Sequence, residues 1–140
     1  MNDDEITISR LTKIGIVLTS ITLIDNIIIY YIGNEFGAFD GFQVGGVDFG
    51  LSNVVTLTVI LLLLGYIGFY LLVNILKIDM KIVRYIATLV VCLSLYLPVI
   101  SIPEEETITK IVLSLMHISS GITVIAGLTS DDLILKYIKY

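Results

Sequence analysis

Two ionisable side chains lie inside long apolar stretches of the sequence, and they are the residues best suited to do chemistry. Asp25 is followed directly by Asn26, and both interrupt a run rich in isoleucine and leucine. His117, the single histidine of the chain, interrupts another such run. A carboxylate and an imidazole in apolar surroundings can bind or pass on a proton or a cation. Ionisable groups at membrane depth are functional candidates for that reason.

Counting along the runs predicts that these residues lie in one layer. Asp25 lies eight residues before Gly33, which follows its run, and His117 lies seven residues after Lys110, which precedes its run. At 1.5 Å per residue of helix, both are about 10–12 Å from the same end. Ser94, in a third run, falls at the same level. We therefore predict an intramembrane polar layer of Asp25, Asn26, Ser94 and His117.

Two roles for this polar layer remain open at the level of sequence. It is either a proton- or cation-responsive site or a hydrogen-bonded layer that fixes the register of the helices. We favour the structural role, because one aspartate with one histidine is a small constellation and local polar networks often serve packing.

The remaining reactive residues exclude several kinds of site. Cys92 is the single cysteine, so an intramolecular disulfide and a dithiol redox pair are both excluded. One histidine cannot build a histidine-rich metal centre, and a nucleophile would lack a base with a third orienting group. The net charge of −5 leaves no basic face for nucleic acid. We expect a non-enzymatic protein with no metal, no cofactor and no nucleic-acid partner.

The elements that would position the polar layer are four apolar runs. The chain has 140 residues, of which 56% are hydrophobic and 15% charged, with a mean hydropathy of +1.00. A soluble domain carries about a quarter charged residues, whereas about 20 apolar residues cross a bilayer. We predict one membrane domain over residues 1–140, an all-α four-helix up-down bundle. Its spans would cover about residues 14–32, 54–76, 82–102 and 111–128.

The basic residues predict how these spans are oriented. Lysine and arginine remain mainly on the cytoplasmic side of a membrane. Seven of the eight fall on one side of the four spans, and Lys110 falls on the other. The seven are Arg10, Lys13, Lys77, Lys81, Arg84, Lys136 and Lys139. The pattern predicts a multi-pass protein of the cell membrane with both termini in the cytoplasm.

Small and weakly polar residues recur at helical spacing in the runs. Such residues allow helices to approach closely and to hydrogen bond across their contact, so they mark packing faces. We assign this packing role to Gly15, Thr19, Thr22, Gly65, Gly68 and Gly121.

A glycine- and phenylalanine-rich stretch between the first two runs predicts a β-hairpin. Gly45 and Gly46 can both adopt positive φ, as a two-residue hairpin turn requires. An isolated hairpin is only marginally stable, so its apolar face should lie on the outer mouth of the bundle or on the lipid surface. A flexible glycine-rich loop is the alternative. In the predicted register, Val44 faces Val47, Gln43 faces Asp48, and Phe42 faces Phe49.

The chain resembles a family of uncharacterised small four-span membrane proteins of bacteria and archaea, a domain of unknown function. The residues that carry the resemblance are Asn26, the segment Leu93-Ser-Leu-Tyr-Leu-Pro98, and the segment Leu113-Ser-Leu-Met-His117 with Gly121. The likeness covers about residues 13–128. It implies an integral membrane four-helix protein and supplies no activity.

Taken together, these features predict a small membrane subunit or scaffold. It would act by helix–helix and outer-loop contacts, with the lipid bilayer around it and a second copy or another membrane protein as its partner. The alternative is a small transporter, or a proton- or cation-responsive membrane protein, that uses Asp25 and His117.

Overall fold

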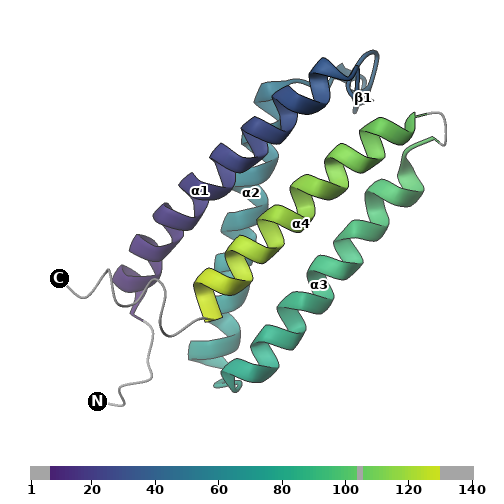
Figure 1. Ribbon diagram of the computed structural model, residues 1–140. Helices are drawn as coiled ribbons and strands as arrows, with labels where there is room; N and C mark the ends of the chain where they lie inside the picture. The colour runs from purple at the N-terminus through teal and green to yellow at the C-terminus, as the bar shows by residue number, and fades with distance from the viewer. Residues whose placement is uncertain (1–6, 104–105, 130–140) are drawn as a thin grey trace.

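Four helices and a short hairpin make up the computed structural model, which describes residues 7–103 and 106–129. Consecutive helices run antiparallel, so the chain makes four passes that alternate in direction (Figure 1). The elements are α1 (Ile8–Glu35), β1 (Gln43–Val44), β2 (Val47–Asp48), α2 (Leu51–Tyr70), the π-helix η1 (Leu71–Ile75), α3 (Met80–Ser101) and α4 (Thr107–Thr129).

The helices confirm the predicted all-α class and extend the predicted spans by a few residues at most ends. Three of them are long and apolar enough to cross a membrane among the described residues, namely α1, α2 together with η1, and α4. Thr7 caps the start of α1, where its side chain accepts a bond from the Arg10 backbone N–H. Asp79 caps the start of α3 in the same way.

Most of the core of the bundle is built by three of the four helices, and α3 adds the buried Val83. Ile14 and Leu18 of α1 are buried against Leu62 and Tyr66 of α2, with Val124 and Leu128 of α4 packed on them. Helix α3 packs along α4 and, at its beginning, on η1. The helix therefore lies at the side of a three-helix core (Figure 1).

Glycines bring the helices of this bundle unusually close at two contacts. A Cβ added at Gly33 of α1 would lie 2.7 Å from a methyl of Val112 on α4. A Cβ at Gly121 of α4 would lie 2.6 Å from a methyl of Val91 on α3. A Cβ atom in a protein is essentially never this close to a non-bonded carbon. The backbones can therefore approach this closely only because these positions lack a side chain.

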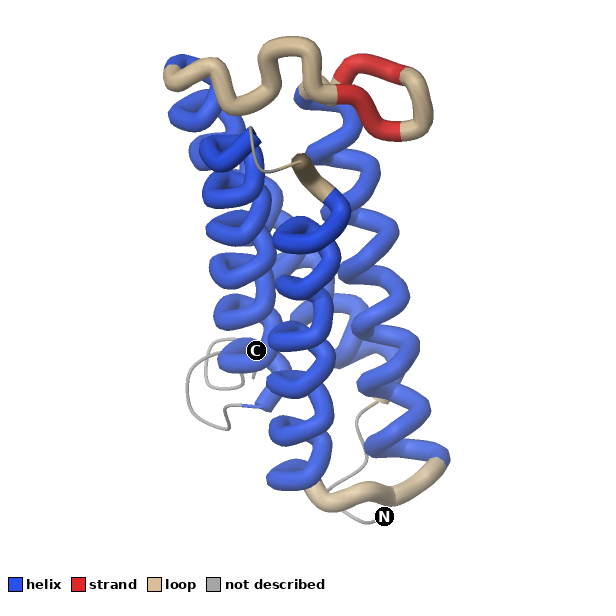
Figure 2. The backbone as a smooth tube through the Cα atoms, turned by 90° about the vertical axis from the view of Figure 1, so that its right-hand side faces the viewer, coloured by secondary structure: helices blue, strands red, loops and turns tan. Residues whose placement is uncertain are grey.

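The predicted hairpin forms at one end of the bundle, hereafter the hairpin end (Figure 2). Its register is the predicted one, with Gln43 opposite Asp48 and Val44 opposite Val47. The Gln43 amide also donates to the Asp48 carboxylate at 2.8 Å. The turn has φ angles of +63° at Gly45 and +79° at Gly46, which a type I′ turn requires.

The hairpin uses only its base to contact the bundle. Phe49 is buried and Phe42 half-buried, and their ring centroids lie 5.6 Å apart. In the predicted register, Val44 and Val47 share one apolar face with Phe42 and Phe49, a face expected on the outer mouth of the bundle or on the lipid surface. The two phenylalanines contact the bundle, whereas Val44 and Val47 are 43% and 63% exposed.

Stacked aromatic rings close the hairpin end. Phe39 lies between Tyr30 of α1, at 5.1 Å, and Phe49, at 4.9 Å. These rings cover a buried cluster that includes Val112 and Met116 of α4. The loop between α1 and α2 is therefore an ordered lid on the core.

Candidate functional site

A buried network of hydrogen bonds joins the three core helices at the depth where the polar layer was predicted. The Asn26 amide nitrogen on α1 donates to Thr58 Oγ1 on α2, at 3.0 Å, and to Ser120 Oγ on α4, at 3.1 Å. Ser120 Oγ also lies 3.4 Å from Asn26 Oδ1. Asn26 is 4% exposed and Thr58 is 8% exposed. We call Asn26, Thr58 and Ser120 the polar seam.

Asp25 lies beside this polar seam. Ser119 Oγ of α4 donates to the Asp25 carboxylate at 3.2 Å, and both residues are half-buried. Each of the two immediately precedes a member of the polar seam, so α1 and α4 are joined by two adjacent polar contacts.

His117 and Ser94 do not join these contacts in the described part of the chain. His117 Nδ1 lies 2.9 Å from the Leu113 carbonyl of its own helix, and Ser94 Oγ donates to the Val91 carbonyl at 2.8 Å. The predicted layer therefore assembles around Asn26 and Asp25, with His117 and Ser94 bonded to their own helices. Bonds to the preceding turn satisfy a polar side chain without any second helix.

Thr58, Ser119 and Ser120 were not predicted to belong to the polar layer. A usable signal for Thr58 was its depth, because it lies eight residues after Gly50, whereas Asn26 lies seven residues before Gly33. The same count along helices therefore places them level. For the two serines the depth of His117 was the signal, since they follow it by two and three residues.

A second polar contact joins α1 and α2 nearer the opposite end. The Tyr66 hydroxyl lies 3.2 Å from Thr19 Oγ1 and donates to the Gly15 carbonyl at 3.2 Å. The predicted packing roles of Gly15 and Thr19 agree with this geometry. Thr22 lies between the two polar contacts with 0% exposure, and its hydroxyl has no partner among the described residues.

Gly65 and Gly68, for which we predicted a packing role, contact no other helix of the described chain. A Cβ added at either position would meet nothing within 4 Å. The neighbouring Tyr66 and Phe69 carry the contacts of α2 with the core, and both are buried. Because residues next to one another on a helix point about 100° apart, the two glycines turn away from the other helices of the chain.

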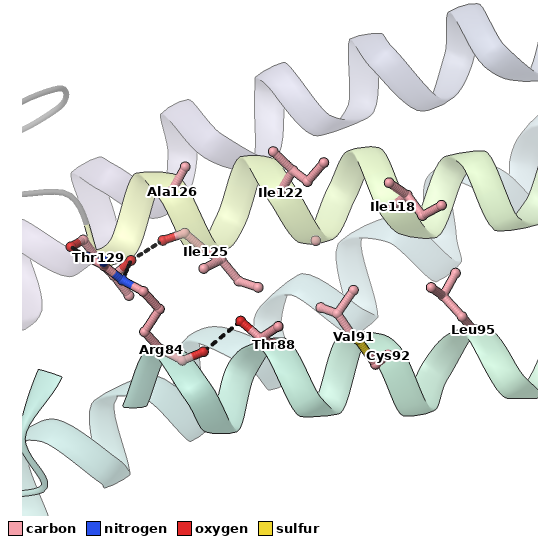
Figure 3. A pocket seen from close by; sticks show the side chains of 11 residues that line it. Arg84, Thr88, Val91, Cys92, Leu95, Ile118, Ile122, Ile125, Ala126 and Thr129 are labelled. Carbon is pink, nitrogen blue, oxygen red and sulfur yellow. Dashed lines mark hydrogen bonds between the residues drawn. The ribbon is translucent and has the colours of Figure 1, made fainter. Parts of the chain in front are cut away.

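A groove about 740 Å³ in volume runs between α3 and α4 (Figure 3). Arg84 of α3 stands at one end of it. Its Nε donates to Thr129 Oγ1 at 3.0 Å and its Nη2 to the Thr129 carbonyl at 2.6 Å. The remaining walls are mostly apolar, and Val91, Cys92 and Leu95 of α3 contribute to them.

The polar contacts described above form no metal centre within the residues that the structure describes. No group of three or more His, Cys, Asp and Glu side chains gathers there. What the polar seam can do is donate and accept hydrogen bonds between helices.

Comparison with known proteins identifies the family. A family model described as a family of unknown function, DUF6069, matches residues 7–132. The chain belongs to this family. No curated protein and no solved structure matches it. The DUF6069 description agrees with the resemblance to an uncharacterised family and names no activity, so the function is argued from the geometry.

Proposed function

We propose that the chain is a non-enzymatic membrane subunit or scaffold. The observation that carries this proposal is the polar seam, in which Asn26 bonds α2 and α4 at once while only 4% exposed. Polar side chains at membrane depth stabilise helix contacts when they bond across them. In this reading the polar groups of the core hold the helices in register.

The surfaces left for a partner lie on the outside of this core. Gly65 and Gly68 lack side chains on the outside of α2, and no other helix of the described chain covers these two positions. The hairpin tip exposes Val44 and Val47. A partner helix could approach α2 closely at the glycines, and an outer domain could contact the valines.

The test is native mass spectrometry of the protein released gently from its own membranes. We expect an assembly with a second copy or with another membrane protein. Gly65→Leu should weaken this assembly by blocking close approach at α2. Ser20→Leu is the matched control, because Ser20 is exposed on α1 and its hydroxyl donates to the Ile16 carbonyl of the same helix. A wild-type protein that is always a monomer would contradict the proposal.

The alternative function is transport of, or response to, a proton or cation through Asp25 and His117. The observation that favours it is the half-buried Asp25 carboxylate, whose partner Ser119 is uncharged. In proteoliposomes that hold a pH-sensitive or cation-sensitive dye, this function predicts a flux that Asp25→Asn and His117→Gln abolish. The scaffold proposal predicts no such flux and an assembly that survives both substitutions.

A further inference from the structure

We propose that the groove between α3 and α4 binds one anionic phospholipid, with the phosphate at Arg84 and one acyl chain along the groove. This inference goes beyond the scaffold function and uses none of the residues of the polar seam.

Arg84 places a positive charge at one end of the groove. Among the described residues, the acceptors of Arg84 are two neutral oxygens of Thr129, which do not compensate the charge of the guanidinium. A guanidinium has five N–H donors, and these two bonds use two of them. Arg84 is exposed, and so is Lys81 one turn earlier on α3. Planar N–H donors of arginine suit the oxygens of a phosphate.

Beyond Arg84, the walls of the groove are mostly apolar. The groove continues along α3 past Thr88 to Val91, Cys92 and Leu95. On α4 it is lined by Ile118, Gly121, Ile122, Ile125, Ala126 and Thr129. Figure 3 shows Arg84 reaching from α3 to Thr129, with the isoleucines of α4 and Val91 and Leu95 of α3 farther along. A cation followed by apolar walls matches a charged headgroup followed by a hydrocarbon chain.

The length of the groove along α3 fits a lipid of one leaflet. Arg84 and Leu95 are eleven residues apart on α3, which at 1.5 Å per residue is about 16 Å. Half of the hydrocarbon core of a bilayer is about 15 Å thick. A lipid of one leaflet, with its phosphate at the level of Arg84, would therefore extend its acyl chain to the far end of the groove. The volume of about 740 Å³ lies within the range of ligand pockets.

Gly121 allows α3 and α4 to touch along the bottom of the groove. Its missing side chain lets α4 approach Val91 of α3 closely, so the two helices touch behind the groove. Arg84 then links the ends of the same two helices through Thr129. An acyl chain in the groove would cover their remaining apolar side chains.

The test measures which lipid the full-length protein retains in native mass spectrometry after extraction in mild detergent. Phosphatidylglycerol and phosphatidylcholine with the same acyl chains are added at increasing concentration. We expect one tightly retained phosphatidylglycerol and weaker retention of phosphatidylcholine. Arg84→Gln should reduce the affinity for phosphatidylglycerol by about tenfold or more, as loss of charge-assisted hydrogen bonds does. Lys13→Gln is the control. It removes one exposed positive charge from α1 at the end of the bundle that also carries Arg84.

A second variant tests the acyl-chain part and leaves Arg84 intact. Ala126 lines the groove and is exposed, so Ala126→Leu should fill part of the groove and lower retention while the helices stay folded. Ser20→Leu adds a larger side chain at an exposed position of α1, away from the groove, and should leave lipid retention unchanged. Inorganic phosphate alone should not raise the melting temperature.

Four results would overturn the proposal. The first is equal retention of both lipids, and the second is an equal loss in Lys13→Gln and Arg84→Gln. Stabilisation by inorganic phosphate as large as by the lipid would indicate a free-phosphate site. A dimer that dissociates in Ala126→Leu would assign the groove to a second copy of the chain.

Discussion

At the scale of single residues, the core of this protein contains one satisfied and one unsatisfied polar side chain close together. Asn26 reaches two partners on two helices, whereas the Thr22 hydroxyl, one turn earlier, has none in the described structure. A buried polar group without a partner destabilises a fold, and a paired one stabilises it modestly. The two residues should therefore respond in opposite directions to substitution by apolar residues.

Thr22→Val is expected to stabilise the protein. Valine keeps the shape of threonine and removes a hydroxyl that is 0% exposed and unpaired, so the free energy of unfolding should rise by about 1 kcal/mol. Reversible unfolding in mixed detergent micelles measures this change. Thr12→Val, at an exposed hydroxyl already bonded to the Ile8 carbonyl, should be nearly neutral. A loss of stability in Thr22→Val would mean that the hydroxyl has a partner.

Asn26→Ala is expected to destabilise the protein. It leaves the Thr58 and Ser120 hydroxyls without their amide partner in a buried place, which should lower the free energy of unfolding by about 1–2 kcal/mol. The same unfolding experiment measures it, with Ser20→Ala as a control that removes a bond within one helix. An unchanged stability would mean that the polar seam does not hold the helices together.

The sequence predicts the place of Asp25 and Asn26 better than it predicts the residues that hydrogen bond with them. Asp25 and Asn26 stand out because they interrupt an apolar run. The serines and Thr58 do not stand out, since such residues also bond their own helix, as Ser94 and Thr88 do here. Whether a polar side chain reaches a neighbour depends on the rotation of its helix, and a depth count along the sequence gives only its level.

At the scale of elements, the helix contacts depend on which glycines face a neighbour. Gly121→Ala should destabilise the α3–α4 contact by about 1–3 kcal/mol, because the added Cβ would lie 2.6 Å from a Val91 methyl. Gly65→Ala should be neutral or stabilise α2 by up to about 1 kcal/mol, because alanine favours helix and nothing lies within 4 Å. Thermal unfolding of both variants checks this, and Val91→Ala should restore part of the loss in Gly121→Ala. Equal effects at both glycines would contradict the assignment.

Gly121 and Gly65 also show which helix contacts a sequence pattern can predict and which it cannot. Both lie in apolar helices, yet one faces Val91 and the other faces away from the chain. The hairpin was easier to predict, because the Gly45-Gly46 pair determines its turn type and hence its register. Local geometry fixed the hairpin, whereas packing of separate helices decided the role of each glycine.

At the scale of the whole molecule, the basic residues gather away from the hairpin. Arg10 and Lys13 lie near the start of α1, and Lys81 and Arg84 lie near the start of α3, both at the end opposite the hairpin (Figure 1). A cysteine placed at Asp40, near the hairpin, should react with a membrane-impermeant thiol reagent added to intact cells. A cysteine at Asp79 should not react, with both substitutions made in a Cys92→Ser background. The reverse labelling would place the hairpin in the cytoplasm.

The lateral position of α3 has a consequence for how the molecule opens. Helices α1, α2 and α4 share buried side chains, whereas α3 is packed mainly on α4. Local unfolding starts where the fewest buried contacts must break, and such regions exchange their amide hydrogens first. Hydrogen exchange of the protein in lipid nanodiscs should therefore show α3 as a cooperative unit that opens before the other three helices. The remaining three would stay protected as one folding unit, with the ends of α3 still tied to them by its two loops.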